Sequence, residues 1–296
     1  MSQKDTNKKY DSQQEKESSF SKPFIINLFF EQKCEMPDKK LMSEIMSKHI
    51  GDVDCFSYDK SLAGFSARKY PIKTDKGIVY PQLMIMNCTN STADLKIDDF
   101  TKSQMWDCPE SEEIFEKCNY NIAATELFTS IMDYKDRANL LMDYSEAVAE
   151  MFPSCKAVMF RNSEKLFLRE RVVRHNIPKD SRFIYFAVNV RFFNIAGTHD
   201  HIVDTLGMST LHLPDLQYHF HTADPNHVVQ HAYSFLQYIY ENNCPIKSGE
   251  TVDGLKNGVM DESVRWVCHY EDSLIKPQRD VIDICMGEFA AGERGE

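Results

Sequence analysis

The chain has 296 residues, of which 42% are hydrophobic and 27% are charged, the balance of an ordinary soluble globular protein. Its 34 Lys and Arg stand against 45 Asp and Glu, which gives a formal net charge of −11. Because phosphates and anionic lipids both attract basic surfaces, an acidic chain is a poor partner for either. Composition therefore argues against nucleic acid and membrane partners.

Residues 1–22 are rich in Lys, Ser, Gln and Glu and lack the apolar segment of an export signal, so we predict a disordered polar tail there. No stretch approaches the ~20 apolar residues of a membrane span. The nine cysteines are scattered and odd in number, which favours reduced thiols over a disulfide framework. These features together predict a cytoplasmic protein.

The first half of the chain alternates short apolar runs with amphipathic stretches. Asp38 is the expected N-cap of a helix that ends at Gly51, and Asp133 begins a second helix that Pro153 ends. Between these two helices, Ile114, Cys118 and Ile122 recur at i, i+4 spacing, which predicts the apolar face of another helix. Residues 94–106 are expected to form a polar link. Short apolar runs predict strands over residues 24–30, 53–57, 63–70, 82–88 and 157–160.

The second half is richer in expected strands. Phe183–Ile195 is the most apolar window and predicts the strongest of them. Asp224 and Pro225 combine an N-cap with proline at the first helical position, which predicts a helix that ends before Pro245. Further strands are expected over residues 202–206, 215–221, 265–270 and 281–285, with a loop or hairpin over 249–262.

This order of elements predicts an α+β protein with mixed or mostly antiparallel sheets and packed helices. We expect two lobes in one continuous body, because no Pro-, Gly- or Ser-rich linker divides the chain. The predicted limits are a tail over 1–22, an N-terminal lobe over 23–177, a C-terminal lobe over 178–288 and a flexible tail over 289–296.

Several sequence blocks in the second half of the chain stand out together. They are Asn189–Phe193, Asp204–Met208, Leu213–Phe220, Ser248–Gly254, Tyr270–Leu274, Pro277–Arg279 and Val281–Asp283. From about Phe24 onward, and most densely from Asn189 to Glu288, the chain resembles the bacterial domain of unknown function 4261 family. The resemblance implies an intracellular bacterial protein, and it implies no particular reaction, cofactor or catalytic residues.

Histidines are concentrated in one segment, since seven of the ten fall between His199 and His231. His219 and His221 are two apart on an expected strand, whereas His227 and His231 are four apart on an expected helix, so each pair shares a face. The two pairs could converge on zinc or another divalent metal, which takes imidazole and carboxylate ligands. Solvent-exposed or hydrogen-bonded histidines would give the same pattern.

A candidate pocket is predicted on the same strand. Asp215, Gln217 and His219 alternate onto one face, and an Asp beside a His can orient the imidazole for proton transfer or for binding. Arg191 and Asp204, from the two preceding strands, complete the set. The alternative is that these groups tie neighbouring turns and strand ends together.

No serine nucleophile elbow and no phosphate-binding glycine loop occurs in the sequence. We therefore predict no cofactor and a non-catalytic module that binds a protein partner, for example an immunity protein that neutralises a basic toxin. The alternative is a metal-assisted hydrolase that uses the His/Asp-rich segment 199–231. A third hypothesis is a proton sensor, because clustered imidazoles titrate near neutrality.

Overall fold

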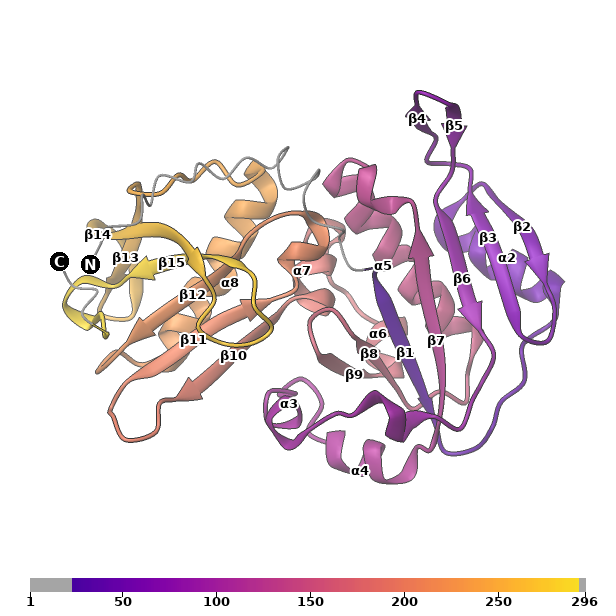
Figure 1. Cartoon of the computed structure of the whole chain (residues 1–296), viewed down its shortest axis with the longest axis horizontal. Helices are drawn as coiled ribbons and strands as arrows, with labels where there is room; N and C mark the ends of the chain where they lie inside the picture. The colour runs from indigo at the N-terminus through magenta and orange to yellow at the C-terminus, as the bar shows by residue number, and fades with distance from the viewer. Residues whose placement is uncertain (1–22, 293–296) are drawn as a thin grey trace. The chain divides into compact units, whose positions relative to one another are not determined.

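The computed structural model describes residues 23–292, which form two units, each with its own sheet (Figure 1). The chain passes from one unit to the other between Ala187 and Val188, and the lobe boundary predicted from the sequence lies after residue 177. The predicted tail over 1–22 lies outside the described residues. The predicted α+β class, with mixed or mostly antiparallel sheets and packed helices, is confirmed. Within residues 23–292 no helix is long and apolar enough to cross a membrane.

The N-terminal unit is built on a seven-stranded sheet with the order β2-β3-β6-β7-β1-β8-β9, in which every neighbouring pair is antiparallel. A separate small hairpin, β4–β5, turns at Asp75 and Lys76, and Gly77, the first residue of β5, has a φ of 123° that suits glycine. The strands are β1 (Ile25–Phe30), β2 (Val53–Tyr58), β3 (Leu62–Ala67), β4 (Ile72–Thr74), β5 (Gly77–Val79), β6 (Gln82–Met86), β7 (Tyr120–Leu127), β8 (Ala157–Phe160) and β9 (Lys165–Leu168).

Two helices, α2 (Lys39–Ile50) and α5 (Tyr134–Met151), pack on one face of this sheet; Figure 1 shows α2 behind β2 and β3. The predicted N-caps are confirmed: the Asp38 carboxylate accepts from Leu41 N at 3.0 Å, and that of Asp133 accepts from Lys135 N at 2.9 Å. The helices end as expected, because Gly51 caps α2 and Pro153 follows α5 closely.

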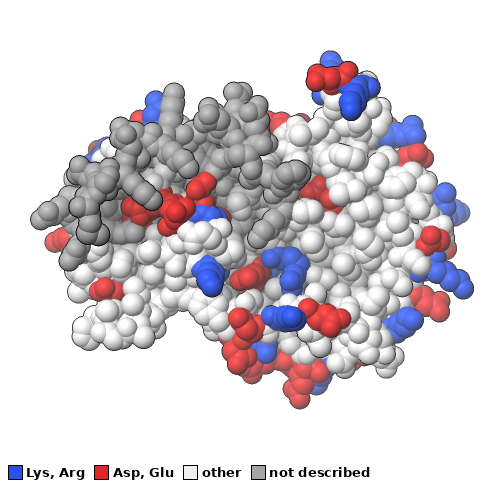
Figure 2. All heavy atoms as spheres, in the orientation of Figure 1, with Lys and Arg blue, Asp and Glu red and all other residues white. Residues whose placement is uncertain are grey.

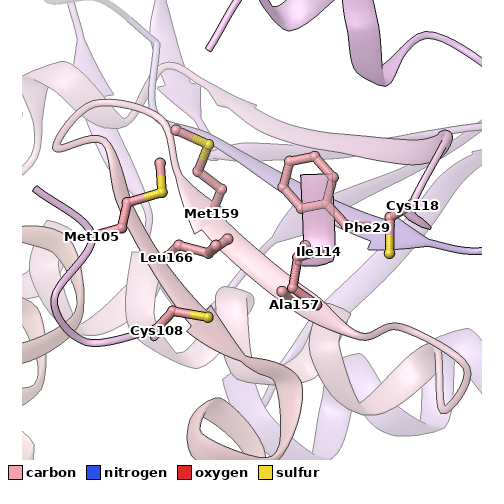
Figure 3. Close-up of a cluster of buried hydrophobic side chains, with 8 residues drawn as sticks. All are labelled: Phe29, Met105, Cys108, Ile114, Cys118, Ala157, Met159 and Leu166. Atoms are coloured by element: carbon pink, nitrogen blue, oxygen red, sulfur yellow. The ribbon is translucent and has the colours of Figure 1, made fainter. Parts of the chain in front are cut away.

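On the opposite face, described residues form a buried cluster over β1, β8 and β9. There the segment with η1 (Thr92–Leu95), α3 (Asp99–Ser103) and α4 (Ser111–Lys117) lays sulfur and aliphatic side chains on the sheet (Figure 3). This cluster comprises Phe29, Met105, Cys108, Ile114, Cys118, Ala157, Met159 and Leu166.

Three sequence predictions in this unit were wrong in part. Ile122 lies in β7 and not in a helix, because α4 ends at Lys117. The expected polar link over 94–106 contains α3. The apolar window Phe183–Ile195 is split into helix α7 (Arg182–Ala187) and strand β10, which reflects the fact that a short apolar run fits a buried helix as well as a strand. A further helix, α6, covers Arg169–Val173.

The C-terminal unit has a six-stranded mixed sheet with the order β10-β11-β12-β15-β14-β13. Only the β12–β15 pair is parallel among these strands. Helix α8 (Pro225–Asn242) follows β12 and packs on one face of the sheet, starting at the predicted N-cap Asp224. The strands are β10 (Asn189–Asn194), β11 (His201–Leu206), β12 (Asp215–Phe220), β13 (Thr251–Lys256), β14 (Val259–Asp272) and β15 (Asp280–Cys285).

The chain after β15 stays attached to this unit as far as it is described. Phe289 ends the short helix η5 (Gly287–Phe289), and Ala290 bridges to Phe220. Ala291 N donates to the carbonyl of His219 at 3.0 Å. The first residues of the predicted flexible tail, 289–292, are therefore tied to β12.

Candidate functional site

Four of the five predicted pocket residues lie together on one face of the six-stranded sheet. Strand register places Arg191 opposite Asp204, and Asp204 opposite Gln217. The guanidinium of Arg191 donates to both carboxylate oxygens of Asp204, from Nε at 2.9 Å and from Nη2 at 2.6 Å. Together with Asp215, all four residues have an exposed fraction of 0%. They form a buried ion network.

A second cation, Arg279, completes the network. Its Nη2 donates to Asp204 Oδ2 at 2.7 Å, and its Nε donates to Asp215 Oδ2 at 3.2 Å. Its Nη1 donates to the carbonyls of Ile275 at 3.0 Å and Pro277 at 2.8 Å. Arg279 therefore fastens the loop before β15 to the sheet. The sequence predictions gave it no role, although two buried carboxylates beside one arginine require another cation.

Asp215 and Gln217 hold adjacent loops. The Asp215 carboxylate accepts from Thr205 Oγ1 at 3.0 Å and from Met208 N at 3.1 Å. Burial raises the pKa of the Asp215 carboxyl, although Arg279 opposes that shift. Gln217 donates to Asp283 Oδ1 at 2.9 Å and accepts from Leu274 N at 2.7 Å. These contacts agree with the alternative prediction, in which Asp215 and Gln217 hold neighbouring turns and strand ends together.

His219, the fifth predicted residue, lies away from the network. Its Nε2 is 3.7 Å from Asp200 Oδ2, and its ring lies against Gly292, where an added Cβ would be only 2.6 Å from the imidazole. The alternation of β12 was predicted correctly, but the strand carries His219 toward the end that Ala291 covers.

The four histidines proposed as metal ligands do not converge. His231 reaches the sheet from α8, whereas His219 is on the opposite face, because Tyr218, which bonds His231, alternates with it. His221 Nδ1 is 3.1 Å from its neighbour Thr222. Among residues 23–292 no three His, Cys, Asp or Glu side chains are grouped so that they could hold a metal ion. The zinc hypothesis therefore has no ligand set among the described residues.

His231 has a clear structural role instead. Its two ring nitrogens lie 2.8 Å from the Tyr218 hydroxyl and 2.8 Å from the Asp253 carbonyl, and its exposed fraction is 1%. Burial lowers the pKa of this imidazole, so the folded state holds it neutral.

We expect His231→Leu to lower the free energy of unfolding by about 2 kcal/mol, because the buried Tyr218 hydroxyl and Asp253 carbonyl lose their hydrogen-bond partner. Since the folded pKa lies below the ordinary value of 6.5, the stability from His231 is complete above that pH and is lost as the pH falls below it. Urea unfolding between pH 8 and about 5 measures both effects. In the matched variant His227→Leu, on the same helix but half exposed, the change should stay within about 0.5 kcal/mol.

A titratable cluster that the sequence did not indicate lies in the N-terminal unit. Glu146 of α5 accepts from Arg182 Nη1 at 2.6 Å and from His175 Nε2 at 2.9 Å, and its Oε2 is 3.7 Å from His49 Nδ1. Burial opposes ionisation, but the nearby His49 ring and the hydrogen bonds from His175 and Arg182 outweigh it and lower the pKa of Glu146 to about 2. This cluster joins α2, α5 and α7.

Among residues 23–292, no helix packs on the face of the seven-stranded sheet opposite α2 and α5 over β2, β3, β6 and β7. We call this surface the open sheet face. Phe56 is 46% exposed and lies over Gly64, where a Cβ would be 2.6 Å from its ring, and Leu127 is 38% exposed. Met84 and Met86 are half-buried there. Figure 2 shows a broad area without Lys, Arg, Asp or Glu over these strands.

The fold and its sites together define an α+β protein with a buried ion network in one unit and an open sheet face with exposed Phe56 and Leu127 in the other. Residues 204–285, from β11 to β15, match the family model described as Domain of unknown function (DUF4261). That segment includes Asp204, Asp215, Gln217 and Arg279, and it confirms the resemblance found in the sequence. Searches of curated proteins and of solved structures gave no match.

Proposed function

We propose that this chain is a non-catalytic protein-interaction module that holds a protein partner on the open sheet face. The observation that carries the proposal is the uncovered apolar surface of Phe56, Met84, Met86 and Leu127. Large contiguous apolar patches on a protein surface mark interaction sites, because their exposure to water is unfavourable. Methionine suits such a surface, since its flexible thioether adapts to the shape of a partner.

Charge favours a basic partner. Residues 188–292 contain six Lys and Arg against fourteen Asp and Glu, whereas residues 23–187 contain 22 against 25. The net charge of residues 188–292 is therefore more negative than that of residues 23–187. Two of its six cations, Arg191 and Arg279, are enclosed in the ion network. An acidic surface speeds and selects association with a basic protein, as an immunity protein for a basic toxin requires.

The test is a double variant, Met84→Glu with Met86→Glu, which places two carboxylates on the open sheet face. Wild-type chain and variant serve as bait in a lysate of the source organism, and captured proteins are quantified by mass spectrometry. We expect a basic protein that binds the wild type and binds the variant at least about 30-fold more weakly, because an interface then has to bury unpaired charge.

The matched control is Ile78→Glu with Val259→Glu, which adds the same charge at side chains that are 58% and 69% exposed. It should keep the partner, and both double variants should keep the wild-type circular dichroism spectrum. The proposal is wrong if no protein distinguishes the face variant from the control. It is also wrong if the open sheet face joins two copies of this chain, which light scattering would reveal as a dimer that the face variant dissociates.

A further inference from the structure

A pocket of about 280 Å³ lies within the C-terminal unit, where the turn before α8 meets the β13–β14 hairpin and the residues after β15. Asp224 and His227 line it from the start of α8, and Asn257 lines it from the hairpin turn. Trp266 and Phe289 contribute aromatic rings. Its position and lining separate this pocket from the ion network and from the open sheet face.

The walls of the pocket are held by local structure. Asn257 and Gly258 have φ angles of 53° and 79°, as a two-residue hairpin turn requires. The His227 ring packs so closely on Gly258 that a Cβ there would lie 2.4 Å from Cε1. Thr222, with φ of 60°, makes a strained turn just before the helix, and its hydroxyl lies 3.1 Å from His221 Nδ1. The shape of the pocket therefore exists without a ligand.

The charged side chain that lines the pocket is acidic. Asp224 is the only Asp, Glu, Lys or Arg among the lining residues. Its Oδ1 caps α8 by accepting from Asn226 N at 2.9 Å, while its Oδ2 lies 3.9 Å from His227 Nδ1. One carboxylate oxygen is thus left for a ligand. The surrounding unit, with fourteen acidic against six basic residues, adds a long-range field that attracts cations.

We propose that this pocket binds a small organic cation through a primary ammonium or guanidinium group. The Asp224 carboxylate supplies the charged acceptor, the Asn257 amide and Thr222 hydroxyl supply neutral acceptors, and Trp266 and Phe289 present aromatic surface that attracts cations. An anion is disfavoured, because no Lys or Arg lines the pocket and the full negative charge of Asp224 outweighs the partial positive charge of the α8 N-terminus. The inference stands apart from the proposed protein partner.

Isothermal titration calorimetry of the full chain tests this proposal with cadaverine and agmatine as probes. Their neutral and anionic counterparts are 1,5-pentanediol and glutarate. We expect both amines to bind at least about tenfold more tightly than the diol, and glutarate not to bind. A lysine-containing tripeptide with blocked ends is a further probe: weaker binding than cadaverine assigns the pocket to free amines, and tighter binding assigns it to a side chain of a protein.

Asp224→Asn is the decisive variant, because asparagine caps a helix as well as aspartate does and removes only the charge. It should leave the thermal midpoint within about 2 °C of the wild type and weaken amine binding at least about tenfold. The matched control Glu241→Gln removes one negative charge from the far end of α8 and should change affinity less than about twofold.

Three results would overturn the proposal. The first is that neither amine binds, by calorimetry or by ligand-observed NMR. The second is that the diol or glutarate binds as tightly as the amines. The third is that Asp224→Asn and Glu241→Gln weaken binding equally. That result would show that amine affinity depends on the net charge of the unit and not on a contact with Asp224.

Discussion

Replacing Arg279 with methionine is expected to lower the free energy of unfolding by about 3–5 kcal/mol, the largest effect that we predict for a single substitution. Arg279 is the cation shared by Asp204 and Asp215, and both carboxylates have an exposed fraction of 0%. Without it, Arg191 alone faces two buried negative charges. The loop carbonyls of Ile275 and Pro277 also lose their donor.

Urea unfolding followed by tryptophan fluorescence measures this change, because Trp266 is buried in the affected unit. Arg279→Lys should fall between wild type and Arg279→Met, since an ammonium keeps the charge but cannot bridge both carboxylates in the same plane. The matched control is Arg265→Met. Arg265 pairs with Asp253 at the surface, with side chains 54% and 38% exposed, and should cost less than about 1 kcal/mol. Equal losses in the two methionine variants would contradict the assigned role of the network.

The features that sequence predicts well are those set by neighbours in the chain. Asp38, Asp133 and Asp224 each cap the helix predicted for them, because an N-cap bonds backbone amides two or three residues further on. The alternation of β12 likewise brought Asp215 and Gln217 to one face. Such patterns need no knowledge of the rest of the fold.

The remaining features depend on contacts between distant segments. Arg279 reaches Asp204 across 75 positions of the chain, and it does so because β15 pairs in parallel with β12, a register that no local pattern indicates. The histidine pairs failed to meet for the same reason. Their spacing was interpreted correctly within each element, but the sheet itself separates His219 from His231. The local periodicity of a sequence predicts which side chains share one face of a helix or strand. The pairing and packing of distant segments determine which residues that face contacts.

The second large effect concerns the cluster around Glu146. Glu146→Gln should lower the free energy of unfolding by about 3 kcal/mol near neutral pH, because the folded pKa of about 2 lies well below the ordinary value of 4.5. The glutamine keeps the shape of the side chain but leaves Arg182 and His175 without their shared carboxylate.

The sign of the pH dependence follows from two shifts. A lowered carboxyl pKa means that the stability from Glu146 is complete above pH 4.5 and is lost as the pH falls toward 2. The Glu146 carboxylate beside the ring raises the pKa of His49, and the hydrogen bond to Glu150 adds to this shift against the effect of burial. The stability from His49 is therefore complete below pH 6.5 and is lost as the pH rises through its folded value.

Urea unfolding from about pH 2 to pH 9 separates these contributions. In Glu146→Gln the loss of stability below pH 4.5 should shrink, while the alkaline slope should only weaken, since Glu150 still lies 2.7 Å from His49. Glu113→Gln is the matched control, because Glu113 pairs with Lys117 on an exposed helix face and should change stability by less than about 0.5 kcal/mol. An acid slope as steep in Glu146→Gln as in the wild type would show that other carboxylates govern the acid stability of the chain. A smaller slope would identify Glu146, the partly buried carboxylate that contacts His49, His175 and Arg182, as a group whose protonation weakens the packing of α2, α5 and α7.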